Sequence, residues 1–258
     1  MQFTVLTLFP EILHSYFESS IMSKAVEKEI ITYDLVNIRD FATDKHRSCD
    51  DSPYGGGAGQ LMLAEPLAKA LDSVQAYKKR VIYVSPSGKS FTQEKALELS
   101  KENELVFICG RYEGIDQRII NEYVSDELSI GDYVMSSGEV AATVIIDTVY
   151  RLIDGVISNE SLKEESFRDG LLEYPQYTRP RLFKKMKVPE VLLSGNHEEI
   201  KKWRFRKRVE KTLINRPDML ARVLQSSPLS KEVENIIALI TGHEKANKSA
   251  KKRHRNGD

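Results

Sequence analysis

The stretch from Phe107 to Asp147 has the residue types and spacing of a ligand-binding site. Three of its glycines, Gly110, Gly131 and Gly138, fall beside the predicted ends of strands. Glycine lets the backbone approach a ligand closely and adopt positive φ angles, and ligands of open α/β sheets bind beyond the carboxyl ends of the strands. We therefore predict that this stretch forms the floor of a ligand site. Ordinary strand-to-helix turns also use glycine, so spacing alone leaves both interpretations open.

The same stretch predicts strands that alternate with helices. A buried strand ends at Cys109, the turn Arg111–Gly114 leads into a helix, a short strand covers Ile130–Met135, and a buried helix covers Val140–Arg151. Upstream, strands are expected at Phe3–Leu8, Ile30–Ile38, Arg80–Ser85 and Glu104–Cys109, and helices from Pro10, at Ser23–Lys28, at Ala64–Tyr77 and from Thr92. Such alternation predicts an α/β fold with a mostly parallel sheet.

Composition narrows the class of protein. The chain has 258 residues, enough for one large or two smaller domains, and its 41% apolar content supports a substantial core. Two cysteines, Cys49 and Cys109, do not suggest a disulfide framework or a metal cluster, so we expect a reduced, cytoplasmic setting. The N-terminus does not resemble a signal peptide, and no apolar run approaches the ~18 residues of a membrane span.

Charge is unevenly distributed along the chain. Residues 1–160 hold 15 Lys and Arg against 25 Asp and Glu, whereas residues 161–258 hold 23 against 13. A basic C-terminal part suggests a polyanionic partner such as RNA. A predicted helix that opens at Asn196 interleaves cations with Trp203 and Phe205, a pattern that suits RNA backbone contact and base stacking. The other interpretation is inward-facing aromatics with solvated cations.

The segment Arg39–Gly59 is long, irregular and rich in glycine near its end. Long loops within compact domains are usually functional, and a glycine-rich loop suggests phosphate binding. However, no Gly-Lys-Ser/Thr follows it and no strand immediately precedes it, so a P-loop or a dinucleotide-binding loop is not expected. A mobile surface loop remains the alternative.

Several motifs together resemble the bacterial tRNA (guanine-N1)-methyltransferases, which belong to the SPOUT class. The motifs are GRYEGID, SIGDYVMSSGE, LFPE at Leu8–Glu11, DDSPYGGGAG at Asp50–Gly59, PQYTRP at Pro175–Pro180 and VLLSGNHEEIKKWR at Val191–Arg204. Because the matches are colinear and spread over most of the chain, the resemblance is specific. For the glycine-rich loop it implies a position near the methyl donor and the RNA.

The resemblance implies a SPOUT-type, mostly parallel α/β sheet with a C-terminal trefoil knot that holds the donor, plus a small all-α C-terminal domain. We expect a methyl-donor-binding domain at 1–154, an interdomain linker at 155–174, an α-helical tRNA-binding domain at 175–243 and a basic disordered tail at 244–258. The resemblance also implies a homodimer with active sites shared across the interface. General rules of chain topology would not have predicted a knot.

The implied activity is transfer of a methyl group from S-adenosylmethionine to N1 of guanosine at tRNA position 37, just 3′ of the anticodon, which forms 1-methylguanosine. Another SPOUT activity, such as ribose 2′-O-methylation, is disfavoured by the matches in the C-terminal domain. The alternative is a non-catalytic or differently targeted SPOUT RNA-binding protein. The resemblance leaves open a magnesium ion that acts through the tRNA or a carboxylate, and no metal-binding residue is assigned.

Guanine N1 carries a proton at neutral pH, so the chemistry needs a base and a group that stabilises charge developing toward O6. The family's proposed base is the Asp of a Glu-Asp-Ser-Phe segment. The matching segment here is Glu164–Phe167, which places Glu165 at the position of the base. The longer side chain moves the carboxylate by ~1 Å, enough to affect positioning. Asp169 is a nearby competitor, but the flanking residues keep Glu165 in register. The matching arginine is Arg151, which we expect to hold the guanine, although it could equally be a helix-end arginine favoured by the helix dipole.

For the methyl donor, the family's residues carry over to two motifs and one strand end. The expected donor-binding residues are Gly110, Ile130, Gly131, Asp132, Tyr133, Val134 and Met135, with Glu113 for the donor's amino group and Tyr83, Ser85 and Pro86 in the same pocket. One departure concerns a wall of this pocket, because Ser137–Ala141 stands where family members often have Gly-Gly-Glu-Leu-Pro.

Overall fold

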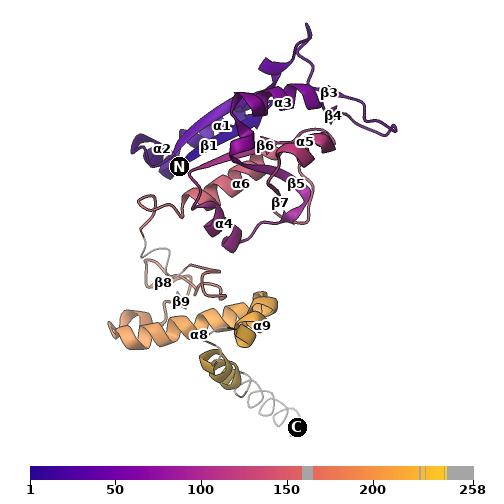
Figure 1. Cartoon of the computed structure of the whole chain (residues 1–258). Coiled ribbons are helices and arrows are strands. Elements are labelled where there is room, and N and C mark those ends of the chain that lie inside the picture. Colours follow the sequence, from indigo (N-terminus) through magenta and orange to yellow (C-terminus); the bar gives the residue numbers. More distant parts are fainter. Residues whose placement is uncertain (159–164, 227, 230, 241, 243–258) are drawn as a thin grey trace. The chain divides into compact units, whose positions relative to one another are not determined.

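A five-stranded parallel sheet forms the centre of the first part of the chain (Figure 1). Its order is β2 (Thr32–Asn37), β1 (Gln2–Thr7), β6 (Glu104–Cys109), β5 (Arg80–Ser90) and β7 (Asp126–Ser129), with every neighbouring pair parallel. The computed structural model describes residues 1–158, 165–226, 228–229, 231–240 and 242. The chain divides into two compact units, Met1–Ser158 and Asn159–Asp258. The α/β class and the mostly parallel sheet are therefore confirmed.

Both faces of the sheet are buried because its strands carry apolar residues at successive positions. On β6, Phe107 belongs to the hydrophobic cluster on one face, and its neighbours Val106 and Ile108 belong to the cluster on the other. Successive side chains of a strand point to opposite faces, so an unbroken apolar run is what a sheet covered on both sides requires.

Helices supply the two covering layers (Figure 1). One face packs against α1 (Pro10–Phe17), α2 (Ser20–Glu27), α4 (Gln93–Leu99) and α6 (Gly138–Tyr150). The other packs against α3 (Ala64–Ser73), α5 (Gln117–Tyr123) and the short 3₁₀ helices η1 (Ile38–Phe41) and η2 (Ala76–Lys78). The first unit is thus a three-layer α/β/α sandwich, with two small strands, β3 (Asp50–Asp51) and β4 (Leu61–Met62), paired antiparallel outside the sheet.

The predicted helix starts at Thr92 and Asn196 are confirmed by their caps. The Thr92 hydroxyl accepts a hydrogen bond from the backbone N–H of Lys95 at 3.3 Å. The Asn196 side chain accepts one from the backbone N–H of Glu199, also at 3.3 Å. Each cap satisfies an N–H that has no partner within the first helical turn.

The short strand predicted at Ile130–Met135 is wrong. The strand is β7, which ends at Ser129, and the residues after it form a loop. The Ser129 hydroxyl accepts a hydrogen bond from the N–H of Gly131 and donates one to its carbonyl oxygen. This local turn competes with the sheet ladder for the backbone groups that a longer strand would use.

The second unit is mainly helical, with α8 (His197–Asn215), α9 (Pro217–Ser226) and a helical segment at 231–240. An all-α unit was expected, but a hairpin of β8 (Leu182–Phe183) and β9 (Met186–Lys187) precedes the 3₁₀ helix η3 (Glu190–Leu193). Leu171, Val209, Leu220, Val223 and Val233 form its buried cluster. The predicted tail at 244–258 and the part of the predicted linker at 159–164 lie outside the described residues.

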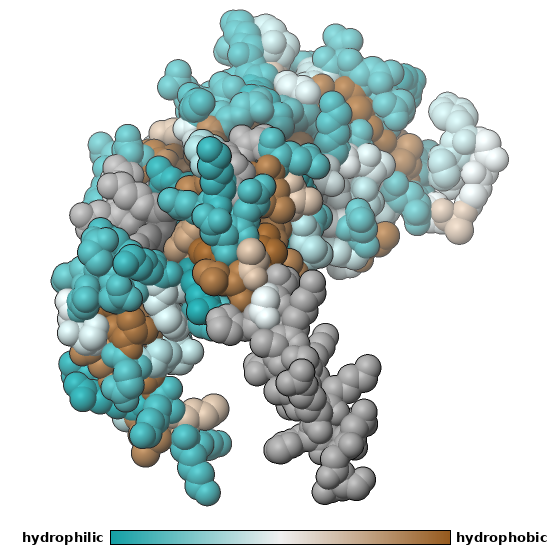
Figure 2. Space-filling view, turned by 90° about the horizontal axis from the view of Figure 1, so that it is seen from below, coloured by the Kyte–Doolittle hydropathy of each residue, from teal (hydrophilic) through white to brown (hydrophobic). Residues whose placement is uncertain are grey.

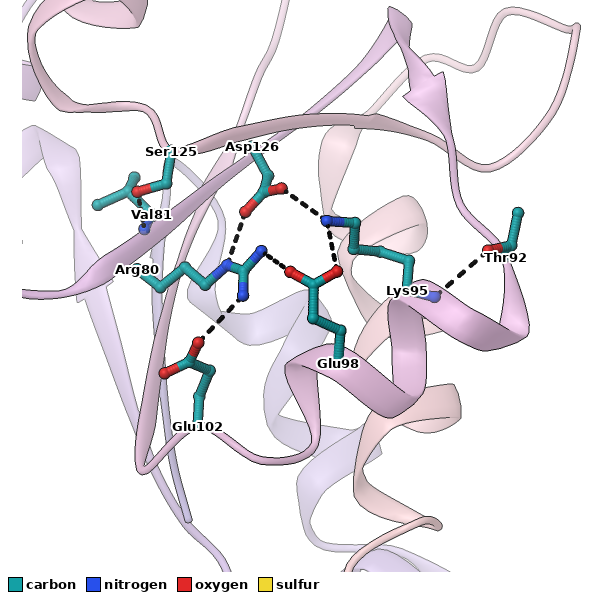
Figure 3. Close-up of polar contacts among 8 residues, drawn as sticks. All are labelled: Arg80, Val81, Thr92, Lys95, Glu98, Glu102, Ser125 and Asp126. Carbon is teal, nitrogen blue, oxygen red and sulfur yellow. Dashed lines mark hydrogen bonds and ion pairs between the residues drawn. The ribbon is translucent and has the colours of Figure 1, made fainter.

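An ion network links the amino-terminal ends of β5 and β7 to α4 and the segment that follows it (Figure 3). Arg80 donates to Asp126 at 2.7 Å and to Glu102 at 3.0 Å, and it also pairs with Glu98. Lys95 completes the network through Asp126 at 3.1 Å and Glu98 at 2.9 Å. Burial opposes ionisation of Asp126, but the hydrogen bonds from Arg80 and Lys95 hold its pKa below the ordinary value.

Figure 2 shows one face on which hydrophilic residues predominate and hydrophobic residues gather in smaller areas. No described helix has the length and apolarity needed to cross a membrane. Among the described residues, no three His, Cys, Asp or Glu side chains converge as metal ligands would. Cys49 and Cys109 are both buried and are not joined in a disulfide.

We expect Arg80→Met to lower the free energy of unfolding by about 2 kcal/mol near neutral pH, because it leaves three carboxylates without their shared partner. The lowered pKa of Asp126 means that its stabilising contribution is present above its unfolded-state pKa of about 4 and is lost as the pH falls through the lower folded-state value. The difference between variant and unchanged protein should therefore shrink below about pH 4.

Urea denaturation at several pH values measures this difference. Lys69→Met is the matched control, because it removes an exposed pair with Glu65 and should change stability by no more than about 0.5 kcal/mol. Equal effects of the two substitutions would contradict a special role for the Arg80 network.

Candidate functional site

A cavity of about 400 Å³ lies at the carboxyl ends of β5, β6 and β7. Three chain segments line it: the middle of β5 with its bulge, the turn and helix start after β6, and the end of β7 with the loop that leads into α6. Its volume is in the range of small-ligand sites, and its place beyond the strand ends is where open α/β sheets bind ligands.

Glycines allow these segments to meet. A Cβ atom built on Gly138 would lie 2.7 Å from the backbone nitrogen of Gly110, so any side chain there would force the segments apart. The N–H of Gly138 donates to the carbonyl oxygen of Gly110 at 3.0 Å. A Cβ on Gly110 would also lie 3.0 Å from the Tyr83 ring. Both glycines therefore permit a close backbone approach that the sequence predicted only in general terms.

A bulge in β5 forms one wall of the cavity. Val84 and Lys89 both pair with Leu128, so the residues between them loop out of the sheet. A Cβ on Gly88 would lie 2.5 Å from the backbone nitrogen of Leu128, which explains why glycine stands where β5 returns to β7. Bulges of this kind re-aim side chains beside functional sites.

The bulge presents two hydroxyl groups. The Ser85 and Ser87 side-chain oxygens lie 2.7 Å apart, and the Ser87 hydroxyl donates to Glu127 at 2.8 Å. Both serines and Glu127 line the cavity together with Tyr83. Burial raises the pKa of Tyr83, and the charge of Glu127 raises it further, so Tyr83 remains a neutral phenol at neutral pH.

A buried glutamate, Glu139, connects the elements that surround the cavity. Glu139, in the first turn of α6, is fully buried and accepts a hydrogen bond from the Thr7 hydroxyl at 2.6 Å. Arg111 pairs with it at 3.2 Å, and the Arg111 guanidinium also lies 4.4 Å from the centre of the Phe9 ring. The ends of β1 and β6 and the start of α6 are thus joined through one buried side chain.

The glycine-rich loop is tied to the turn that lines the cavity. The N–H of Glu113 donates to the carbonyl oxygen of Gln60 at 2.9 Å, and the N–H of Met62 donates to that of Gly114 at 3.0 Å. Gly59 has φ +89°, and a Cβ on it would lie 2.4 Å from the Glu113 carboxylate. The base of this loop therefore lies against the Arg111–Gly114 turn.

Ten of the eleven expected donor-binding residues line this single cavity. They are Tyr83, Ser85, Pro86, Gly110, Glu113, Ile130, Gly131, Tyr133, Val134 and Met135. Asp132 is exposed and is not among the lining residues. Sequence reasoning did not assign Ser87 and Glu127. The Ser-Pro-Ser-Gly sequence after a predicted strand could have indicated Ser87 as a site residue. No local pattern indicated Glu127, because its position beside the cavity depends on how the strands pair.

Neither of the two expected catalytic residues is among the described residues that line this cavity. Arg151 caps the carboxyl end of α6, whereas the cavity contacts the amino end of that 13-residue helix, which is about 20 Å long. Glu165 belongs to the second unit. Its competitor Asp169 is held there by Arg208, which pairs with both of its carboxylate oxygens, and it also accepts from the N–H of Leu171 at 3.3 Å.

The helix α8 carries exposed cations on a partly apolar body. Phe205 packs against the buried cluster of the second unit, and Trp203 lies 6.3 Å from the Tyr177 ring. Lys201 and Lys202 are more than two-thirds exposed and pair with glutamates on the same helix. Such exposed pairs contribute little to stability, so a phosphate can replace the glutamates at small cost.

These features define an α/β protein with a glycine-lined cavity at the strand ends, joined to a cationic, mainly helical unit. Residues 1–222 match the family described as tRNA (Guanine-1)-methyltransferase TrmD. The chain belongs to this family.

Relatives named tRNA (guanine-N(1)-)-methyltransferase extend the match along nearly the whole chain. The protein of Treponema denticola is 69% identical over 237 residues, which cover 92% of this chain and 98% of the relative. That of Treponema pallidum is 60% identical over 237 residues, covering 92% and 95%. That of Borreliella burgdorferi is 60% identical over 227 residues, covering 87% and 95%.

We expect Glu139→Gln to lower the free energy of unfolding by about 3 kcal/mol, because the amide leaves the Arg111 charge without its buried partner. Urea denaturation of the full chain measures the change. Glu122→Gln makes the same chemical change at an exposed position of α5 and should cost no more than about 0.5 kcal/mol. A Glu139→Gln protein as stable as this control would show that the buried pair does not hold the cavity together.

Proposed function

We propose that this protein transfers a methyl group from S-adenosylmethionine to N1 of the guanosine at tRNA position 37. The observation that carries the proposal is the cavity at the strand ends, which gathers the donor-binding motif residues in a chain of this family. The relatives are named for methyl transfer to guanine N1 of tRNA, which supports the target base and the RNA class.

The cavity residues fit S-adenosylmethionine, which supplies an activated methyl group when bound. The N–H and carbonyl oxygen of Gly131 are bonded to the Ser129 hydroxyl, so backbone groups of the loop that follows Gly131 would hydrogen-bond the edge of an adenine. Ile130 and Met135 offer apolar contact to its ring. Glycine at position 110 avoids pressure on the Tyr83 ring, which also lines the cavity, because a methyl group there would lie 3.0 Å from that ring. Glu113 provides a carboxylate for the donor's ammonium group.

On the RNA side, Glu165 removes the proton of guanine N1 and Arg151 holds O6, where negative charge develops. Asp169 is the weaker candidate for the base, because both of its oxygens face Arg208. This assignment gives the carboxylate and the arginine separate tasks, proton transfer and charge stabilisation.

The proposal includes a homodimer whose active sites combine residues from both chains. The supporting observation is the separation along α6: within one chain, Arg151 lies about 20 Å from the end of the helix that contacts the cavity. Val140 and Val144 on the same helix are 50% and 42% exposed, as expected of a helix face that packs against a second copy. A second chain can bring its own Arg151 to the cavity.

The second unit provides the tRNA contacts in this proposal. The cations of α8 would neutralise backbone phosphates, and the excess of Lys and Arg over Asp and Glu in residues 161–258 supports a polyanionic partner.

The trefoil knot also belongs to the proposal, supported by the backbone-to-backbone contact between Gly138 and Gly110. A cytoplasmic location follows from the tRNA substrate and agrees with two buried thiols. No step is assigned to magnesium.

Methyl transfer from labelled S-adenosylmethionine to two unmodified tRNA transcripts, one with guanosine and one with adenosine at position 37, tests the reaction. We expect product on the guanosine transcript only. Glu165→Gln should lower the rate by at least about 100-fold, because the amide cannot accept the N1 proton. Asp169→Asn is the matched comparison and should retain the larger part of the activity.

Activity that survives Glu165→Gln and is lost in Asp169→Asn would move the base to Asp169. Donor binding without transfer to either transcript would overturn the enzyme assignment in favour of a non-catalytic RNA-binding protein.

Mixing two inactive variants tests the shared active site. Gly110→Val fills the cavity and Arg151→Ala removes the arginine, so each homodimer should be inactive. Randomly assorted dimers should recover up to about a quarter of the unchanged activity, because half are mixed and each mixed dimer holds one intact site. Circular dichroism and size-exclusion chromatography first establish that both variants are folded dimers. Folded variants that form mixed dimers without any recovered activity would place both residues of a site in the same chain.

A further inference from the structure

Three residues that line the cavity carry a full charge among those that the structure describes: Arg111, Glu113 and Glu127. The Arg111 guanidinium is compensated by the buried Glu139 carboxylate at 3.2 Å. The two glutamates therefore give the cavity a negative balance, and a cavity with low-dielectric walls strengthens the field that such charges produce.

The two glutamates are placed differently. The Glu113 carboxylate lies against the glycine-rich loop, since a Cβ on Gly59 would approach it to 2.4 Å. Glu127 lies on β7 and is oriented from the β5 bulge by the Ser87 hydroxyl, which donates to its Oε1 atom at 2.8 Å. The Ser87 backbone N–H and side chain both contact the Ser85 hydroxyl, at 3.2 and 2.7 Å. The bulge thus holds the Glu127 carboxylate in the wall of the cavity.

The charge of Glu127 acts inside the cavity. It contributes to the raised pKa of Tyr83, after the larger effect of burial, and Tyr83 is a lining residue. Glu127 is also not one of the residues around Glu139 that join β1, β6 and α6. Its side chain is therefore available for an electrostatic role toward the ligand rather than toward the fold.

We propose that Glu127, oriented by Ser87, makes the cavity prefer the positively charged methyl donor over its neutral product; this inference rests on the proposed function. In the transfer, the S–CH₃ bond breaks with its electron pair remaining on sulfur, the methyl carbon bonds to guanine N1, and the N1 proton passes to the base. The ligand thereby changes from a sulfonium cation to a neutral thioether. A fixed carboxylate attracts the first and not the second.

This preference gives Glu127 a role in donor capture and product release. Because the positive charge on sulfur diminishes toward the transition state, the attraction stabilises the bound donor more than the transition state. Glu127 is accordingly a specificity-determining residue for the ligand and carries no part of the chemical step.

Isothermal titration calorimetry with S-adenosylmethionine and with S-adenosylhomocysteine, without tRNA, tests the inference on the full-length protein. Glu127→Gln keeps the shape of the side chain and removes its charge. We expect the donor to bind about tenfold more weakly and the product to bind almost unchanged, so that their affinity ratio falls about tenfold. Ser87→Ala should shift the ratio in the same direction by a smaller factor, because the carboxylate loses its orientation.

Glu122→Gln is the control for the loss of one negative charge at an exposed site outside the cavity, and it should leave the ratio unchanged. Equal weakening of both ligands by Glu127→Gln, or no change in either, would overturn the inference while the proposed function stands. If the unchanged protein bound neither ligand, the proposed function would fail and this inference with it.

Discussion

The buried carboxylate of Glu139 is the constraint on which the site depends. Taking an ionised group out of water costs several kcal/mol, which is recovered only when partners surround it. Here Thr7 donates from the end of β1, and Arg111 pairs with it from the turn after β6. The helix start itself favours a negative charge in its first turn. Since all three elements meet at one group, moving either of the other two away from α6 would remove a polar partner of the buried Glu139 side chain.

That arrangement determines where the cavity lies. With α6 held against the end of β6, the backbones at Gly110 and Gly138 come into direct contact, and the remaining space opens toward the β5 bulge. Apolar residues from the β7–α6 loop and polar groups from the bulge both line the cavity. A ligand that combines an aromatic ring with a charged chain matches such a lining.

The ion network around Arg80 serves the opposite, amino-terminal ends of β5 and β7. It ties α4 to the sheet, and its side chains are not among those lining the cavity. The first unit therefore carries two separate groups of charges. A polar network stabilises the amino-terminal ends of β5 and β7, and carboxylates near their other ends line the cavity and can act on a ligand. The excess of cations lies in the second part of the chain, where the proposed RNA contacts are.

The sequence by itself determined the α/β class, the parallel sheet, the helix starts at Thr92 and Asn196, and ten of the residues that line the cavity. These features follow from local patterns, namely apolar periodicity, capping side chains and glycines at strand ends, together with motifs shared with one family. Local pattern failed at Ile130–Met135, because the Ser129 side chain redirects the backbone after β7. It also missed the β8–β9 hairpin, whose strands of two residues each are too short to show alternation.

Only the tertiary structure decided that Ser87 and Glu127 share the cavity wall, that Glu139 is buried, and that Asp169 is paired with Arg208. Each of these contacts joins residues between 28 and 132 positions apart, as Ser87 with Glu127, Arg111 with Glu139 and Thr7 with Glu139 show. No local pattern specifies such a pair, because strand register and the crossing of segments at glycine determine which side chains meet. The sequence shows which residue types could take part in the chemistry, whereas the fold determines which side chains they contact.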